Sequence, residues 1–169
     1  MEKVYNDNNY YNLVNDIIYD NNFIKLDNDK HHGISRLEHS QRVSYYSYKV
    51  TKFLRLNYKD TARGALLHDF YLNEDLTEKQ LKISAFVHAK KALENSDKYF
   101  SLSELEKDII YKHMFPLNIT RIPKYMESWI VSSVDKVVAT YEFALSFKRI
   151  CALKYEHAMI LLLILMSQK

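Results

Sequence analysis

Glycine and proline are scarce in this chain, with only 2 of each among 169 residues. A sheet-rich fold needs many tight turns, and tight turns favour Gly, Pro or Asn. The scarcity therefore predicts an all-α fold, in which long helices are joined by a few loops. Hydrophobic residues make up 47% of the chain, enough for a packed core, and the length suits one domain. We therefore expect a single-domain helical bundle over residues 1–169.

The charge and the cysteine content limit the classes of partner. The formal net charge is only +3, from 24 basic and 21 acidic residues, and no long run of Lys or Arg occurs. A nucleic-acid-binding surface needs concentrated positive charge, so we expect no DNA or RNA duplex as a partner. The single cysteine, Cys151, excludes an internal disulfide and is typical of a chain in a reducing cytosol.

Neither end of the chain has the pattern of a targeting or membrane segment. Residues 1–16 lack the apolar stretch of a signal peptide. Near the other end, Ala158 to Met166 is an unbroken apolar run, but its 9 residues fall far short of the roughly 20 that span a bilayer. We therefore expect a cytoplasmic protein with no membrane partner, in which this run forms a buried terminal helix or the contact of a homodimer.

Apolar residues recur at helical spacing along most of the chain. In the segment 36–56, a stripe with spacings of 4, 3, 4 and 3 is expected to form one face of a helix. Its members are His39, Val43, Tyr46, Val50 and Phe53. Further helices are expected over 10–20, 59–70, 84–98, 123–147 and 154–166. The first and last of these are predicted to pack on a core formed by residues 31–142.

Start and stop signals delimit one more helix in the second half of the chain. Ser103 followed by Glu106 has the spacing of a capping box, and Ser101 with Glu104 is an alternative frame. Pro116 is expected to end this helix. Pro123 then suits the first turn of the long helix that follows.

Several ionisable residues lie where the pattern expects apolar ones. His39, His113 and Asp135 each fall on the apolar stripe of a different helix, and the pair His68-Asp69 directly follows Ala65-Leu66-Leu67. Burying a carboxylate costs several kcal/mol unless it is paired or bound to a metal. A metal centre would satisfy these groups together, because neutral imidazole and carboxylate are both metal ligands.

Each of these residues also has an ordinary interpretation. A single histidine is more often a satisfied core or surface residue than a ligand. Asp135 could pair with Arg42, Arg63 or Lys136, and His88 has the least distinctive surroundings of the set. The ordered series His, His-Asp, His, His, Asp on successive helices favours the metal interpretation over these alternatives.

Five segments of the chain carry a family resemblance. They are Glu38-His-Ser-Gln-Arg-Val-Ser, Leu66-Leu-His-Asp-Phe, Phe86-Val-His, Tyr111-Lys-His-Met-Phe-Pro-Leu and Val134-Asp-Lys. Together they resemble the HD superfamily of metal-dependent phosphohydrolases, and in particular its small bacterial members, over about residues 31–142. The resemblance implies an HD-type helical bundle in which six residues hold the metals. These are His39, His68, Asp69, His88, His113 and Asp135.

The resemblance also implies a distribution of roles. His39, His68, Asp69 and Asp135 would hold a first divalent transition-metal ion (Fe, Mn, Zn, Ni or Co). Asp69 would bridge to a second ion completed by His88 and His113, and it would also orient the attacking water as a catalytic residue. The expected reaction is hydrolysis of a phosphate ester or anhydride, in a nucleotide or dinucleotide.

Three further residues are candidates for contact with the substrate. Lys136 is expected to bind a substrate phosphate and to assist catalysis, whereas Arg42 and His32 are expected only to bind substrate. A solvated charge or a structural ion pair is the ordinary alternative for Lys136 and Arg42.

The chain departs from the family at Phe70 and Ala89, where relatives have other residues, which leaves the pocket shape and the substrate open. Two other functions remain compatible with the same ligand set. One is a di-iron oxygenase of the HD type, and the other is a metal- or nucleotide-binding regulatory module without turnover.

Overall fold

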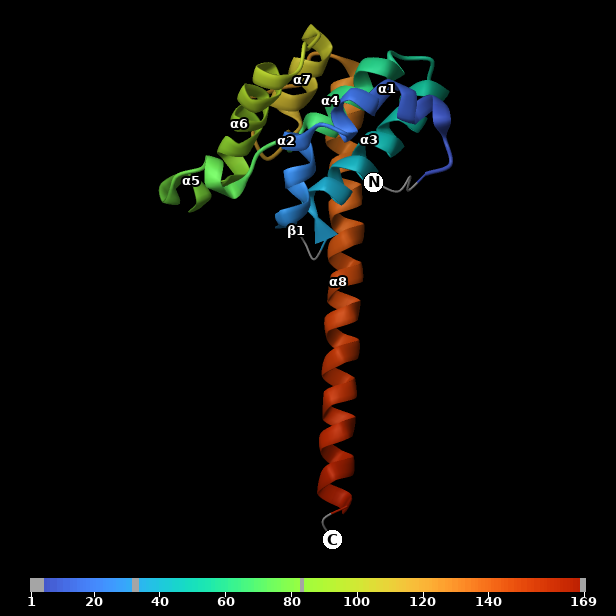
Figure 1. Ribbon diagram of the computed structural model, residues 1–169, viewed down its shortest axis with the longest axis vertical. Helices are drawn as coiled ribbons and strands as arrows, with labels where there is room; N and C mark the ends of the chain where they lie inside the picture. The colour runs from blue at the N-terminus through green and yellow to red at the C-terminus, as the bar shows by residue number, and fades with distance from the viewer. Residues whose placement is uncertain (1–4, 32–33, 83, 168–169) are drawn as a thin grey trace.

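The computed structural model describes residues 5–31, 34–82 and 84–167, and most of them are helical (Figure 1). The helices are α1 (Asn8–Ile18), α2 (Asn21–Ile24), α3 (Arg36–Phe53), α4 (Tyr58–Leu67), α5 (Glu78–Lys82), α6 (Ser84–Tyr99), α7 (Glu104–Lys112) and α8 (Met126–Ser167). Two short 3-10 turns, η1 (Lys25–Asn28) and η2 (Asn73–Asp75), and one antiparallel pair, β1 (Lys30–His31) with β2 (Ile34–Ser35), complete the described elements. The predicted all-α class is confirmed.

Side-chain caps set the starts of several helices. Ser35 accepts a hydrogen bond from the N–H of Glu38 at the start of α3, and Asn57 does the same for Asp60 at the start of α4. The predicted capping box of α7 is confirmed: Ser103 Oγ accepts from the N–H of Glu106 at 3.2 Å, and Glu106 Oε2 accepts from the N–H of Ser103 at 2.6 Å. The helix ends at Lys112, ahead of Pro116.

The stripe predicted for α3 is correct only in its first part. His39 and Val43 are buried, but Tyr46, Val50 and Phe53 are exposed, the last by 86%. The buried face continues instead through small hydroxyl residues, namely Ser40, Ser44, Ser47 and Thr51. Because Ser and Thr count as polar, an apolar periodicity cannot find a face of this kind.

The small residues on α3 allow α4 to pack closely against it. Ser44 Oγ donates to the carbonyl of Ala62 on α4 at 2.6 Å and accepts from the hydroxyl of Tyr10 on α1 at 2.9 Å. These bonds satisfy buried hydroxyls where three helices meet. Tyr10 belongs to the larger apolar cluster, formed mainly by α1, α3 and α4, and Ala65 to a second one shared with α7 and α8.

Gly64 marks the close crossing of α4 and α7. A Cβ at this position would lie 3.1 Å from the Cα of Glu106 and 3.2 Å from the side chain of Ile109. The absence of a side chain at Gly64 therefore allows α4 and α7, which end directly before His68 and His113, to approach each other.

Helix α8 is longer than predicted and continuous. The chain was expected to form one helix from Pro123 and a second from Lys154, but a single helix of 42 residues begins at Met126. No Gly or Pro interrupts the sequence of α8, so nothing breaks the helix between the two expected segments. Figure 1 shows α8 passing through the bundle and then continuing away from the other helices. The prediction that the helix over 154–166 packs on the core is therefore wrong.

Among the residues that the structure describes, no helix combines the length and the apolar character needed to cross a membrane.

We predict that Gly64→Val destabilises the protein because its side chain would overlap the backbone of α7. The free energy of unfolding should fall by about 1–3 kcal/mol, which lowers the melting temperature by roughly 3–10 °C. Lys59→Val, at an exposed position of the same helix, is the matched control and should cost less than about 1 kcal/mol. Equal melting temperatures for the two variants in thermal denaturation would contradict the close crossing.

Candidate metal centre

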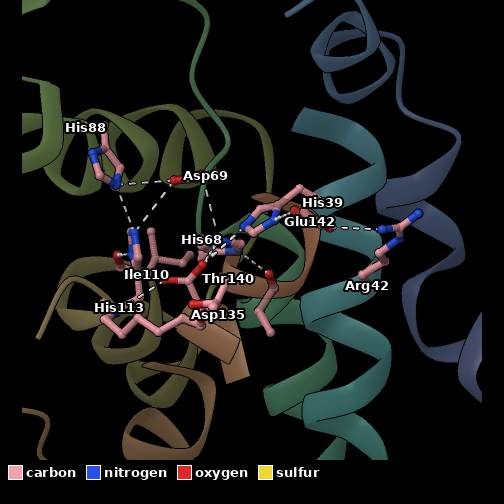
Figure 2. Close-up of polar contacts among 12 residues, drawn as sticks. His39, Arg42, His68, Asp69, His88, Ile110, His113, Asp135, Thr140 and Glu142 are labelled. Atoms are coloured by element: carbon pink, nitrogen blue, oxygen red, sulfur yellow. Dashed lines mark hydrogen bonds and ion pairs between the residues drawn. The ribbon is translucent and has the colours of Figure 1, made fainter. Parts of the chain in front are cut away.

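The six residues predicted as metal ligands come together in the structure, from five helices or their ends (Figure 2). His39 lies in the second turn of α3, His68 is the C-cap of α4 with Asp69 directly after it, and His113 is the C-cap of α7. The remaining two are His88 on α6 and Asp135 on α8. All six are buried, with exposed fractions of 9% or less.

Short distances connect these side chains in one continuous group. His39 Nε2 lies 3.1 Å from Asp135 Oδ1, and His68 Nε2 lies 3.7 Å from the same oxygen. Asp69 Oδ1 lies 3.3 Å from His88 Nε2 and 3.6 Å from His113 Nε2. The two latter nitrogens are 2.9 Å apart. The predicted convergence is thus present.

Two sets of three residues have ligand atoms close enough to share a metal ion. One set is His39, His68 and Asp135, and the other is His68, Asp69 and His113. Within each set the candidate ligand atoms lie within 4.8 Å of one another. His68 belongs to both sets, so it is the residue at which the two groups meet, whereas the resemblance had given that place to Asp69.

Two buried atoms in the group fit a cation better than a purely structural role. Among the described side chains, His68 Nε2 and Asp69 Oδ1 are buried and have no hydrogen-bond partner. An unsatisfied buried acceptor costs about 1–3 kcal/mol, and more when it is charged. Both atoms lie within 3.8 Å of polar atoms of the other candidate ligands, so a divalent ion bound there would satisfy them.

Hydrogen bonds to backbone carbonyls orient two of the imidazoles. His68 Nδ1 lies 2.7 Å from the carbonyl of Ala65, and His113 Nδ1 lies 2.8 Å from the carbonyl of Ile110. Each Nδ1–H therefore donates to the last turn of its own helix, which leaves the Nε2 of each ring facing the group as the atom available to a metal. Fixing the tautomer in this way is a recurrent feature of metal-binding histidines.

His39 is oriented by a residue that the sequence analysis missed. Its Nδ1 lies 2.8 Å from Glu142 Oε2, and Glu142 is only 1% exposed. Arg42 Nη1 in turn lies 3.3 Å from Glu142 Oε1. Glu142 follows Asp135 by seven residues, two turns on the same face of α8, and this spacing was the available signal.

The ring of His88 is held by stacking. The ring of Tyr71 stacks on it at 5.3 Å between centroids, with 26° between the planes. The guanidinium of Arg36 lies 3.8 Å from the centroid of the Tyr71 ring, and Arg36 also donates to the Tyr71 carbonyl at 2.5 Å. Tyr71 and Arg36 are therefore two further residues that shape the group and that the sequence pattern did not identify.

The carboxylates in the group remain ionised despite their burial. Burial raises the pKa of Asp69, but the imidazoles of His68, His88 and His113 outweigh it and hold that pKa below its ordinary value. Burial likewise opposes ionisation of Asp135, but the hydrogen bond from His39 and the nearby imidazole of His68 hold its pKa well below the usual range. The group thus keeps negative charge that favours a cation.

The pKa values of two histidines move in opposite directions. Burial lowers the pKa of His39, but hydrogen bonds to Asp135 and Glu142 outweigh it and raise the pKa to about 10. Burial lowers the pKa of His113 to about 3, and repulsion from His68 and His88 acts in the same direction. Without a cation, His39 therefore carries the proton that offsets part of the negative charge.

The remaining predicted site residues lie at the edge of this group or beyond it. Lys136 Nζ donates to the carbonyl of His113 at 2.6 Å and to Asp135 Oδ2 at 3.2 Å, so the ordinary ion-pair interpretation of Asp135 holds for one of its oxygens. Arg42 lies on the far side of Glu142 from the histidines in Figure 2 and also pairs with Glu38. His32 lies outside the described residues.

Comparisons of this chain with protein-family models, with curated proteins and with solved structures give no match.

We predict that Glu142→Ala weakens divalent-metal binding by about 10- to 100-fold, because His39 loses the partner that fixes its orientation. Glu142→Gln, whose amide oxygen can still accept from Nδ1–H, should retain more of the affinity. Calorimetric titration with Zn²⁺ or Mn²⁺ measures both. Glu38→Ala is the matched control, because Glu38 also pairs with Arg42 but is not a ligand in either set. Unchanged affinity in Glu142→Ala would contradict this role.

We predict that the metal-free protein is most stable near pH 6.5. The lowered pKa of His113 contributes stability that is lost as pH falls from about 6.5 toward 3, and the lowered aspartate pKa values add a loss below about 4. The raised pKa of His39 contributes stability that is complete below about 6.5 and is lost as pH rises toward 10.

Thermal unfolding in EDTA between pH 4 and 9.5 tests this pattern. Glu142→Gln removes one of the two groups that raise the pKa of His39, so the loss of stability above pH 6.5 should be smaller in this variant. If thermal stability falls equally above pH 6.5 in the variant and in the unsubstituted protein, the hydrogen bond between His39 and Glu142 does not control the titration of His39.

Proposed function

We propose that this chain is a metal-dependent phosphohydrolase of the HD type, which cleaves a phosphate ester or anhydride in a nucleotide or dinucleotide. The proposal is carried by one observation: six ionisable residues, chosen from their order in the sequence, form one buried group with unsatisfied ligand atoms inside it. The motif resemblance supplies the reaction class. The mixed imidazole and carboxylate donors favour Mn, Fe, Zn, Ni or Co over Mg, which prefers oxygen ligands alone.

The proposed metal ligands divide between the two sets around His68. His39, His68 and Asp135 would hold one ion, and Asp69 and His113 would hold another together with His68 or His88. Divalent ions bound in this way supply Lewis acidity for phosphate oxygens and make hydroxide available near neutral pH. A purely structural role is less well supported, because a closed structural site needs only four ligands.

Asp69 is proposed to orient the attacking water. Its Oδ1 is buried, lies within 3.6 Å of two imidazole nitrogens and has no hydrogen-bond partner among the described residues. A carboxylate in this state can accept a hydrogen bond from a water molecule and thereby direct a lone pair of the water oxygen toward phosphorus. Its depressed pKa keeps it in the accepting form over the physiological range.

Lys136 is proposed to bind the substrate phosphate at the edge of the group. Its side chain is 32% exposed, and its hydrogen bonds to Asp135 and to the His113 carbonyl hold the ammonium beside the ligands. Positive charge at this position would stabilise the charge that develops during phosphoryl transfer. Arg42 is better suited to holding Glu142, because ion pairs with Glu142 and Glu38 already engage its guanidinium.

The test is a screen of nucleotides and dinucleotides for released phosphate, with the purified protein loaded with Mn, Fe, Co, Ni or Zn. His68→Ala and Asp69→Asn should each lower turnover by at least about a thousandfold, and His68→Ala should also lose bound metal. Asp97→Asn, an exposed aspartate on α6, is the matched control and should retain full activity. Elemental analysis of each variant separates loss of metal from loss of chemistry.

Two outcomes would overturn the proposal in distinct ways. Oxygen-dependent turnover of an organic substrate by the iron-loaded protein, without phosphate release, would assign the site to an oxygenase. Tight nucleotide binding with no product under any metal would assign it to a regulatory module. Full phosphate release by Asp69→Asn would remove the role given to Asp69.

A further inference from the structure

The half of α8 that projects from the bundle exposes large apolar side chains to solvent. Phe147, Ile150, Leu153 and Tyr155 are exposed by 60%, 52%, 49% and 68%. Every residue from 147 to 155 is exposed, and the sequence of the helix continues into the apolar run 158–166. Most of the stability of a helix in a protein comes from packing of its apolar face, and clustered exposed apolar residues mark an interaction surface. We therefore expect a binding partner to bury the apolar surface of this half of α8.

The accessible surface area of the chain shows how much surface is available for such a partner to bury. A compact monomer of 20.2 kDa exposes roughly 8,800 Å². This chain exposes 10,554 Å², about 1,800 Å² more. A stable protein interface hides about 800 Å² of each partner. The excess is thus large enough to supply one copy's share of a stable dimer.

An apolar groove lies beside the first half of the same helix. It encloses about 680 Å³ between α3 and α8 and is lined by Tyr46, Val134, Val137, Tyr141 and Leu145, with Arg42 at its rim. Val137 and Tyr141 are exposed by 69% and 57%. The groove therefore has room and apolar surface for an elongated apolar partner.

The lengths of the two halves match. Helix α8 has 42 residues, so the half in the bundle and the half beyond it each extend about 30 Å. When two copies of α8 lie antiparallel and cross near residue 146, the projecting half of each copy follows the groove of the other. A parallel pair would leave both grooves open and would bring Lys148, Arg149 and Lys154 beside their own copies.

We infer from these observations that the chain forms an antiparallel homodimer through α8, in which the projecting half of each helix covers the apolar groove of its partner. The arrangement uses a surface separate from the six metal-ligand candidates. The dimer proposal can therefore be tested independently of the proposed phosphohydrolase activity.

Oligomeric state gives the first test. Light scattering after size exclusion at tens of micromolar should return twice the 20.2 kDa of one chain. Ile150→Glu on the projecting half and Val137→Glu in the groove should each weaken association by about a hundredfold or more, because either buries a carboxylate in an apolar contact. Phe53→Glu, the same kind of change at an exposed position of α3, should leave the dimer intact.

The single native cysteine tests the direction of the pair. In the antiparallel arrangement the two Cys151 residues lie about 15 Å apart along the helix axis, too far for a disulfide. Cys151 of one copy instead lies beside Tyr141 of the other. Mild oxidation should therefore leave the unsubstituted dimer uncrosslinked, and it should crosslink Tyr141→Cys into a covalent dimer through Cys151.

Three results would overturn the inference. One is a monomer at these concentrations. If that monomer co-floats with phospholipid vesicles in a density gradient, a lipid surface rather than a second copy buries the apolar half of α8. Another is a dimer that persists in both Ile150→Glu and Val137→Glu. The third is a Cys151–Cys151 crosslink in the unsubstituted protein, with no gain from Tyr141→Cys, which would establish a parallel pair. Because metal content is measured on the same samples, failure of the dimer is separable from failure of the metal site.

Discussion

The central constraint on this structure is the burial of two carboxylates, Asp69 and Asp135, among four imidazoles. An ion removed from water costs several kcal/mol even after relaxation, so each carboxylate must have compensating partners. The pairs that His39 and Lys136 form with Asp135 are too few for the whole group, as the unsatisfied Asp69 oxygen shows. A bound cation would satisfy the remaining atoms together.

The packing of the bundle serves this group. Small residues on α3 and Gly64 on α4 allow close helix crossings, so the ends of α4 and α7 bring His68 and His113 within ring contact at 4.8 Å between centroids. Both histidines are C-caps, where the helix dipole favours positive charge. Positive charge between these two helix ends would therefore be stabilised by the backbone as well as by the side chains.

The two halves of the group differ in how their imidazoles are held. His39 donates toward a carboxylate, Glu142, which raises the basicity of the nitrogen facing Asp135. His113 donates to a neutral backbone carbonyl, and His88 is held by stacking against Tyr71. The imidazole of His39 is therefore fixed by a charged partner, whereas the half with His88 and His113 relies on a backbone carbonyl and on ring stacking.

Sequence patterns found five of the six candidate ligands because these residues contradict their surroundings, whereas His88 came only from the motif resemblance. An aspartate on an apolar stripe, or a His-Asp pair in an apolar context, is visible without coordinates, and so is a capping box such as that of Ser103 and Glu106. Residues whose role depends on a neighbour from another helix left a weaker signal, such as the seven-residue spacing of Glu142 from Asp135. Glu142 lies just past the apolar stripe, and only the position of α3 beside α8 makes it the partner of His39.

The same limit explains the errors in the fold. The stripe through Tyr46 and Phe53 obeyed helical periodicity, yet contacts between small hydroxyl residues decided which face of α3 is buried. Likewise, two helices were expected over 123–147 and 154–166, although the sequence between them contains no helix breaker and the structure has one continuous helix. Periodicity reports which residues share a face, but it does not report which partner that face meets.

Helix α8 contributes to two surfaces, the candidate metal centre and the apolar groove, and it must serve both at once. Asp135 and Glu142, two turns apart, point into the bundle, whereas Val137 and Tyr141 lie on another side and line the groove. The seven-residue spacing of the buried acids and the four-residue spacing of the groove residues can coexist only on a straight, uninterrupted helix. The continuity of α8 is therefore a requirement of both surfaces, because a break near residue 140 would move Glu142 away from His39 and remove one wall of the groove.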